Sequence, residues 1–156
     1  MLTVLFLSYN YAFKQPVNKE MLIKNIMAYP ITNIIKRCQK DYHYSDEDMI
    51  ILENELKRYF ILSIGQTLSS LGRGMYSKDV DNLWHTFILF TNEYAKFCNT
   101  FFKRFIHHIP ELEEPSTPEE YQAVRNDFQA FVKNYEETFN EEVHPIWILD
   151  MCENNT

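Results

Sequence analysis

The sequence predicts a mainly α-helical fold, a single-domain helical bundle of residues 1–156 organised around one long central helix. Three observations lead to this prediction. Apolar residues recur at steps of three and four over residues 79–106. The chain contains only 3 glycines and 6 prolines, and two sequences typical of helix N-termini precede further apolar stripes. With 46% apolar residues, a chain of this length has ample material for one core.

The first expected element is the apolar segment at residues 1–7. No positive charge precedes it and no small-residue cleavage site follows it, so we expect a short strand or a core segment rather than a signal peptide. A helix is expected from about residue 18, with Pro30 interrupting it because proline lacks the donor that the helix needs. A second helical piece is expected over residues 31–41.

The next helix is predicted from the residues at its N-terminus. Ser45 and Asp48 form the acidic variant of a capping box, which predicts a helix over residues 46–64. Residues 65–77 hold all 3 glycines and are expected to form a loop. Their pattern matches neither GxGxxG nor a P-loop, so a phosphate site is not expected there.

The strongest helical signal covers residues 79–106, which we expect to form one continuous helix and the central strut of the fold. His107, His108 and Pro110 follow it and are typical of a helix C-terminus. The residues of its apolar stripe are Val80, Leu83, Trp84, Phe87, Phe90, Tyr94, Phe97, Cys98, Phe101 and Phe105.

The last helix is expected to begin at a second capping box, formed by Ser116 and Glu119, and to run to about Asn140. Pro118 near its first turn is compatible with a helix start. Residues 143–149 are short and apolar, so they are expected to pack back on the core with Trp147 as an anchor.

Charge is unevenly distributed along the chain. Residues 111–142 carry ten acidic and two basic side chains, and the net charge of the whole chain is −7. An acidic stretch repels phosphate backbones, so direct nucleic-acid binding is not expected. The stretch is either a solvated helix face or a surface for a basic partner. The candidate surface residues are Glu119, Glu120, Glu136, Glu137, Glu141 and Glu142.

The candidate functional face of the long helix consists of Asp81, Trp84 and His85. Asp81 and His85 are four residues apart and share a face, so a hydrogen bond or half of a metal site is possible. The alternatives are a catalytic base or a purely structural pair that locks helices together. Leu89 lies close to this face and suggests that a second layer covers it.

Other chemical groups are expected to stay apart from this pair. In a straight helix, His107 and His108 lie ~33 Å from Asp81 and His85, which argues against joint coordination of one metal. Cys98 is expected to be a buried, unreactive thiol. No nucleophile elbow, HExxH sequence or paired-carboxylate signature is present. No cofactor, catalytic residue or metal is therefore assigned, and His85 and Asp81 remain weak metal candidates.

The segment DVDNLWHTFIL at residues 79–89 resembles the hallmark of the glycine-rich domain-containing protein-like family and its short bacterial relatives. The similarity continues to residue 110, with weaker echoes at residues 55–60 and 145–152. The resemblance implies a helical, intracellular protein and no settled activity. In the longer members of the family, the Trp-His pair is usually followed by Thr-His. In this chain, Phe87 occupies the position of that second histidine. A His-x-His metal pair and the glycine-rich region are both lacking.

The leading functional hypothesis is a non-enzymatic interaction domain. Its acidic surface would bind a basic, nucleic-acid-handling protein, as a small inhibitor or adaptor of phage or bacterial origin does. The alternative is a metal-dependent or acid–base enzyme centred on Asp81 and His85. Three widely spaced cysteines and the lack of a long apolar run favour the cytoplasm and give no reason to expect membrane binding. The oligomeric state is left open.

Overall fold

The fold is seen in a computed structural model that describes residues 19–64, 75–108 and 115–148. These residues form six α-helices and one short 3₁₀ helix, and no strand occurs among them. The mainly α fold class is therefore confirmed, while the strand considered for residues 1–7 lies outside the described residues. The helices are α2 (Lys19–Met27), α3 (Thr32–Tyr42), α4 (Asp46–Leu62), α6 (Lys78–Leu89), α7 (Thr91–Phe102) and α8 (Pro118–Phe139), followed by η1 (Pro145–Trp147).

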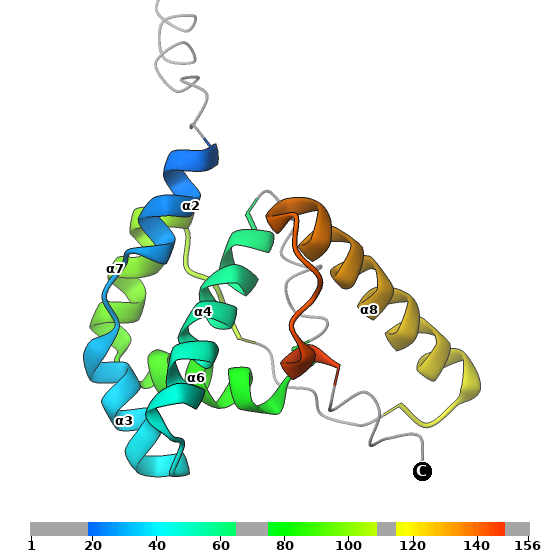
Figure 1. Ribbon diagram of the computed structural model, residues 1–156, viewed down its shortest axis with the longest axis horizontal. Helices are drawn as coiled ribbons and strands as arrows, with labels where there is room; N and C mark the ends of the chain where they lie inside the picture. Colours follow the sequence, from blue (N-terminus) through cyan, green and yellow to red (C-terminus); the bar gives the residue numbers. More distant parts are fainter. Residues whose placement is uncertain (1–18, 65–74, 109–114, 149–156) are drawn as a thin grey trace, which may run out of the picture.

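The helix α4 occupies the centre of the molecule. Figure 1 shows it crossing the middle, with α2, α3 and α7 on one side and α8 on the other, and it contacts α2, α3, α6 and α8. Leu52, Glu55 and Ile61 are all almost fully buried, although they project from different sides of the helix. A helix surrounded in this way, rather than residues 79–106, forms the central strut.

The continuous helix expected over residues 79–106 is instead two helices, α6 and α7, which meet at Phe90. Phe90 has φ −84° and ψ 64°, outside the helical region. The bend lets both halves pack into the same core: the Phe87 ring lies 5.1 Å from the Tyr94 ring and 5.3 Å from the Phe97 ring. No proline or glycine marks this break, and the apolar periodicity continues across it, so the sequence pattern could not reveal it.

Helix ends follow the expected capping chemistry with one shift of register. The capping box of Ser45 and Asp48 at the start of α4 is confirmed. At the start of α8 the box is formed by Thr117 and Glu120. The expected pair, Ser116 and Glu119, was wrong by one residue, because both neighbouring positions carry a hydroxyl followed three residues later by glutamate.

The C-terminal part packs back on the core as expected. Trp147 in η1 is fully buried, and its ring stacks on Tyr59 of α4 at 5.9 Å and lies 4.9 Å from Phe131 of α8. Tyr76 also packs against α8, with its ring centroid 5.0 Å from that of Phe128. Among the described residues, no helix is long and apolar enough to cross a membrane.

Candidate metal centre

The first turns of α6 separate an apolar face from a polar one. Ser77 caps the helix by accepting a hydrogen bond from the backbone N–H of Val80. Val80, Leu83 and Trp84 are buried in the core, which leaves Asp81 and His85 at the edge of that face. As expected for residues four apart, Asp81 Oδ2 and His85 Nε2 face each other, at 3.5 Å.

A third group, His108, completes this cluster, contrary to the expectation from a straight helix. His108 Nε2 lies 2.7 Å from Asp81 Oδ1. The chain turns at Phe90, and α7 ends at Lys103, whose backbone adopts the left-handed conformation (φ 56°). The segment that follows α7 therefore returns to α6 and brings His108 onto Asp81. The expected separation of ~33 Å between His108 and this pair was wrong because it assumed an unbroken helix.

Two buried hydrogen bonds hold this returning segment in place. The Trp84 indole N–H donates to the Tyr94 hydroxyl at 3.0 Å, and that hydroxyl donates to the carbonyl of Ile106 at 2.7 Å. The Trp84 ring also meets the His108 ring edge-on at 4.4 Å. Burial raises the pKa of Tyr94, so its proton stays available for the Ile106 carbonyl. Trp84 therefore positions His108 rather than serving as a reactive group.

The geometry of Asp81, His85 and His108 suits one metal ion. One ligand atom from each residue lies within 4.8 Å of the other two. Ligands at ~2.0–2.2 Å from a metal are separated from one another by roughly 3–3.5 Å. The two distances to the Asp81 carboxylate, 3.5 Å from His85 Nε2 to Oδ2 and 2.7 Å from His108 Nε2 to Oδ1, are already close to this range. The ligand nitrogens of the two imidazoles lie within 4.8 Å of each other, and His85 is the more exposed of the two, with 47% of its side chain exposed against 12% for His108.

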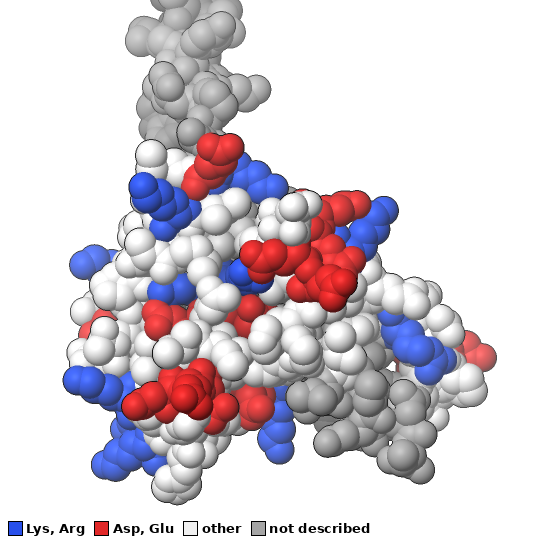
Figure 2. Space-filling model, in the orientation of Figure 1, with Lys and Arg blue, Asp and Glu red and all other residues white. Residues whose placement is uncertain are grey.

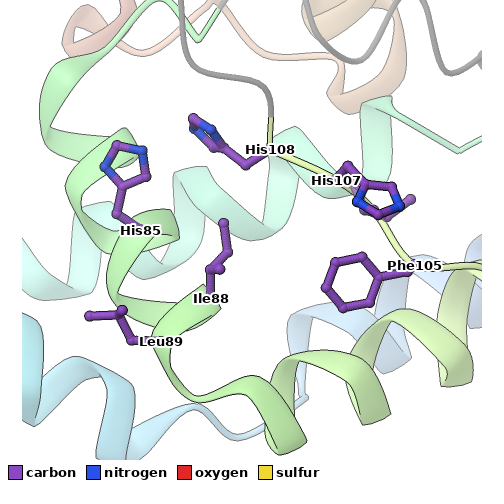
Figure 3. Close-up of a pocket in the computed structure, with 7 residues that line it drawn as sticks. His85, Ile88, Leu89, Phe105, His107 and His108 are labelled. Carbon is purple, nitrogen blue, oxygen red and sulfur yellow. The ribbon is translucent and has the colours of Figure 1, made fainter.

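A shallow pocket of about 480 Å³ opens beside the two imidazoles. Figure 3 shows His85 and His108 at one end and Phe105 at the other, with Ile88 and Leu89 along the α6 side. The side chain of Leu89 is 69% exposed and does not support the second layer that we expected over this face. His107 also lines the pocket, but it is not part of the three-residue cluster.

The six glutamates of the expected acidic surface do not form one patch. Glu119 and Glu120 lie in the first turn of α8, ~24 Å along the helix from Glu136. The Glu120 carboxylate caps the helix by accepting from the backbone N–H groups of Ser116 and Thr117, and these bonds lower its pKa. In Figure 2, acidic side chains gather over the C-terminal end of α8, where Glu136, Glu137, Glu141 and Glu142 lie.

A buried carboxylate that the sequence analysis overlooked joins α4 to the C-terminal elements. Glu55 is 2% exposed and accepts hydrogen bonds from Trp147 Nε1 at 2.7 Å and from the Tyr135 hydroxyl at 3.0 Å. Arg58 donates to the same hydroxyl and pairs with Glu141 at 2.8 Å. Glu141 therefore belongs to a clamp between α4 and α8 as well as to the acidic end. A glutamate at an apolar position of α4 was the only sequence signal for this network.

Two other residues with ionisable side chains, Cys98 and Tyr59, have structural explanations. Cys98 is fully buried, and burial raises the pKa of its thiol, which matches the expected unreactive role. Tyr59 lies in the core behind α6, and burial together with the charge of Asp81 raises its pKa. Neither residue lines the pocket.

A comparison with models of known protein families identifies the family of this chain. A family model described as UCP032817-like matches residues 18–146, most of the chain and all of the cluster. The chain belongs to the UCP032817-like family. No curated protein and no solved structure matches it. The UCP032817-like match includes Asp81, His85 and His108, but its description names no activity.

Proposed function

We propose that this protein binds a first-row divalent transition metal through Asp81, His85 and His108. The observation that carries the proposal is the convergence of these three side chains, which come from α6 and from a segment 27 residues away in sequence. Two imidazoles and one carboxylate are a ligand set used for Zn²⁺ and Fe²⁺. Three protein ligands leave coordination positions for water or a ligand oxygen, which is the arrangement of a catalytic rather than a structural site.

The surroundings support a functional centre. Trp84, Tyr94 and Ile106 fix the backbone that carries His108, as outer groups do in metal sites whose ligands must be held in place. The pocket lies beside the imidazoles and gives access to the positions that the protein leaves open. A metal there would act as a Lewis acid or would lower the pKa of a bound water. This develops the metal-dependent alternative of the sequence analysis.

Calorimetric titration of chelator-treated protein with Zn²⁺ tests the proposal. We expect one site per chain, and His85→Ala and His108→Ala should each weaken binding by about a hundredfold, because each removes one of three ligands. His107→Ala is the matched control, since His107 lines the pocket but lies outside the cluster. His85 is half exposed, so its variant should fold normally. Equal affinity in the wild type and in both ligand variants would rule the centre out.

Binding of a basic protein through the acidic end of α8 is a second candidate function. The gathering of acidic side chains seen in Figure 2 supports it, and opposite charge accelerates association. The partner would be a basic nucleic-acid-handling protein in the cytoplasm, and the chain would act as its inhibitor or adaptor. A complex captured from the native host should weaken with salt and with Glu136→Lys and Glu137→Lys. Glu119→Lys, at the other end of α8, is the control. If all three variants lose the same amount of partner affinity, binding is not localised to the C-terminal end of α8.

The proposed kinship with the glycine-rich domain-containing protein-like family extends over residues 79–110, with weaker echoes at residues 55–60 and 145–152, and it rests most of all on the segment at residues 79–89. In this chain, Asp81, Trp84 and His85 of that segment contribute two of the three candidate ligands and the indole that positions the third. If the kinship holds, the tryptophan of the shared segment should have the same positioning role in relatives. A solved structure of a longer family member would test it.

A further inference from the structure

The pocket beside the candidate metal centre has an apolar wall that is open to solvent. Leu89 is 69% exposed and Phe105 is 44% exposed, which is high for large apolar side chains. Ile88 is partly buried, and Ile106, which also lines the pocket, is almost fully buried. Among the described residues that line the pocket, the polar side chains are the imidazoles of His85, His107 and His108. An apolar wall that ends at metal ligands is typical of a site that binds the polar end of a small molecule at the metal.

The charge of the centre determines which polar end fits. Two neutral imidazoles and one carboxylate around a divalent cation leave a net charge of +1, which favours an anionic oxygen ligand. Apart from Asp81, which would itself bind the metal, no carboxylate lies among the described residues that line the pocket or form the cluster. A negatively charged head group would therefore meet no carboxylate other than Asp81 among the described residues of the wall.

The size of the pocket limits how large the apolar tail of a bound ligand can be. A volume of about 480 Å³ lies in the lower part of the range for small-molecule sites. The pocket is shallow, and Figure 3 shows its apolar side chains along one side of the imidazoles and not around them. A short tail that lies flat on Leu89 and Phe105 fits this shape better than a long chain or a large ring system.

We propose that the pocket binds small monocarboxylates with a short aliphatic or aromatic tail. This inference rests on the proposed metal centre. The carboxylate would occupy the coordination positions that Asp81, His85 and His108 leave open, and the tail would cover Leu89 and Phe105. Burial of these side chains by the ligand would remove the apolar exposure that the free pocket shows.

Titration of the Co²⁺-loaded protein with carboxylates of increasing length tests the inference, with the visible absorption of Co²⁺ as the readout. Affinity should rise about two- to threefold for each methylene from acetate through butyrate to hexanoate, because each added group covers apolar surface. Benzoate should bind at least as well as butyrate. Hexanol, which has the tail without the carboxylate, should leave the Co²⁺ spectrum unchanged.

A pair of matched variants tests whether the tail of the carboxylate ligand contacts Leu89. Leu89→Ala should flatten the dependence on chain length and leave Co²⁺ affinity unchanged, because Leu89 is not a ligand. Ile50→Ala on α4 is the control, since Ile50 is also 69% exposed but does not line the pocket. It should keep the wild-type dependence.

The outcomes separate the two proposals. Co²⁺ binding with equal affinity for acetate and hexanoate, or with a length dependence that survives Leu89→Ala, would overturn the monocarboxylate inference and leave the metal centre standing. A lack of Co²⁺ binding would overturn both.

Discussion

His108 Nε2 lies 2.7 Å from Asp81 Oδ1, although 27 residues separate them in the chain. The contact exists because Phe90 interrupts what would otherwise be one helix and Lys103 ends α7 in a left-handed turn. Two breaks in the backbone thus convert an i, i+4 pair, Asp81 and His85, into a three-residue cluster. A pair of this kind is common on helix surfaces, whereas three converging ligands beside a pocket suggest a metal centre.

The hydroxyl of Tyr94 should be needed both for stability and for metal affinity. Tyr94→Phe leaves two buried groups unpaired, the Trp84 N–H and the Ile106 carbonyl, so it should lower the free energy of unfolding by about 2–3 kcal/mol. It should also weaken Zn²⁺ binding about tenfold, because the segment that carries His108 loses its anchor. Urea unfolding and calorimetric titration measure the two effects.

A core variant distant from the centre provides the control for this prediction. Ile26→Ala in α2 removes a fully buried side chain and should cost about 2–4 kcal/mol. Its Zn²⁺ affinity should be that of the wild type under conditions where both proteins are folded. If Ile26→Ala weakens Zn²⁺ binding as much as Tyr94→Phe, the effect of Tyr94 reflects general destabilisation and not positioning.

The buried Glu55 should be essential for holding the C-terminal elements on α4. Glu55→Gln replaces an acceptor of two hydrogen bonds, from Trp147 and Tyr135, by an amide that offers one oxygen. The expected loss is about 2–3 kcal/mol in the free energy of unfolding, with increased proteolysis in α8. Metal affinity should be unchanged because the clamp lies away from Asp81. A stability equal to the wild type would show that the network is not needed.

The fold should lose stability in alkaline solution. Burial raises the pKa of Tyr59 and Tyr94 from the ordinary value of 10.0 and that of Tyr135 to about 12. The folded state therefore holds these protons more tightly than the unfolded state does. This contribution to stability is complete below pH 10 and is lost as the pH rises toward the folded pKa, by up to about 1.4 kcal/mol per pH unit for each tyrosine.

Urea unfolding at pH 8 and at pH 11 checks this prediction, and absorbance at 295 nm reports the tyrosinates. Tyr135→Phe should reduce the loss of stability between the two values, because it removes one of the linked protons. The exposed Tyr121 supplies the comparison, as Tyr121→Phe should leave the loss unchanged. An unfolding free energy that stays constant from pH 8 to pH 11 would contradict the assignment.

Sequence reasoning was most reliable where local signals act alone. The capping box at Ser45 and the pairing of Asp81 with His85 depend on short spacings that the sequence displays directly, and the burial of Trp147 was expected from the apolar character of residues 143–149. The capping box of α8, formed by Thr117 and Glu120, was misplaced by one residue because neighbouring positions carry equivalent capping signals.

The errors arose where tertiary packing decides the outcome. The break at Phe90 contains no glycine or proline, and it exists because Phe87 and Tyr94 reach the same core only if the chain turns. The proximity of His108 to Asp81 depends on that turn and was therefore excluded. The burial of Glu55 was missed for the same reason, since its hydrogen-bond partners Tyr135 and Trp147 lie 80 and 92 residues away in the sequence. No periodicity within α4 indicates such partners.

The most direct test of the metal centre is X-ray absorption of the Zn²⁺-loaded protein. We expect two imidazole nitrogens and one carboxylate oxygen at ~2.0–2.2 Å from the metal, with an oxygen from solvent as the remaining ligand. In His108→Ala, the imidazole scattering should fall by half. A sulfur ligand at ~2.3 Å, or a wild-type spectrum that persists in His108→Ala, would contradict the centre at Asp81, His85 and His108.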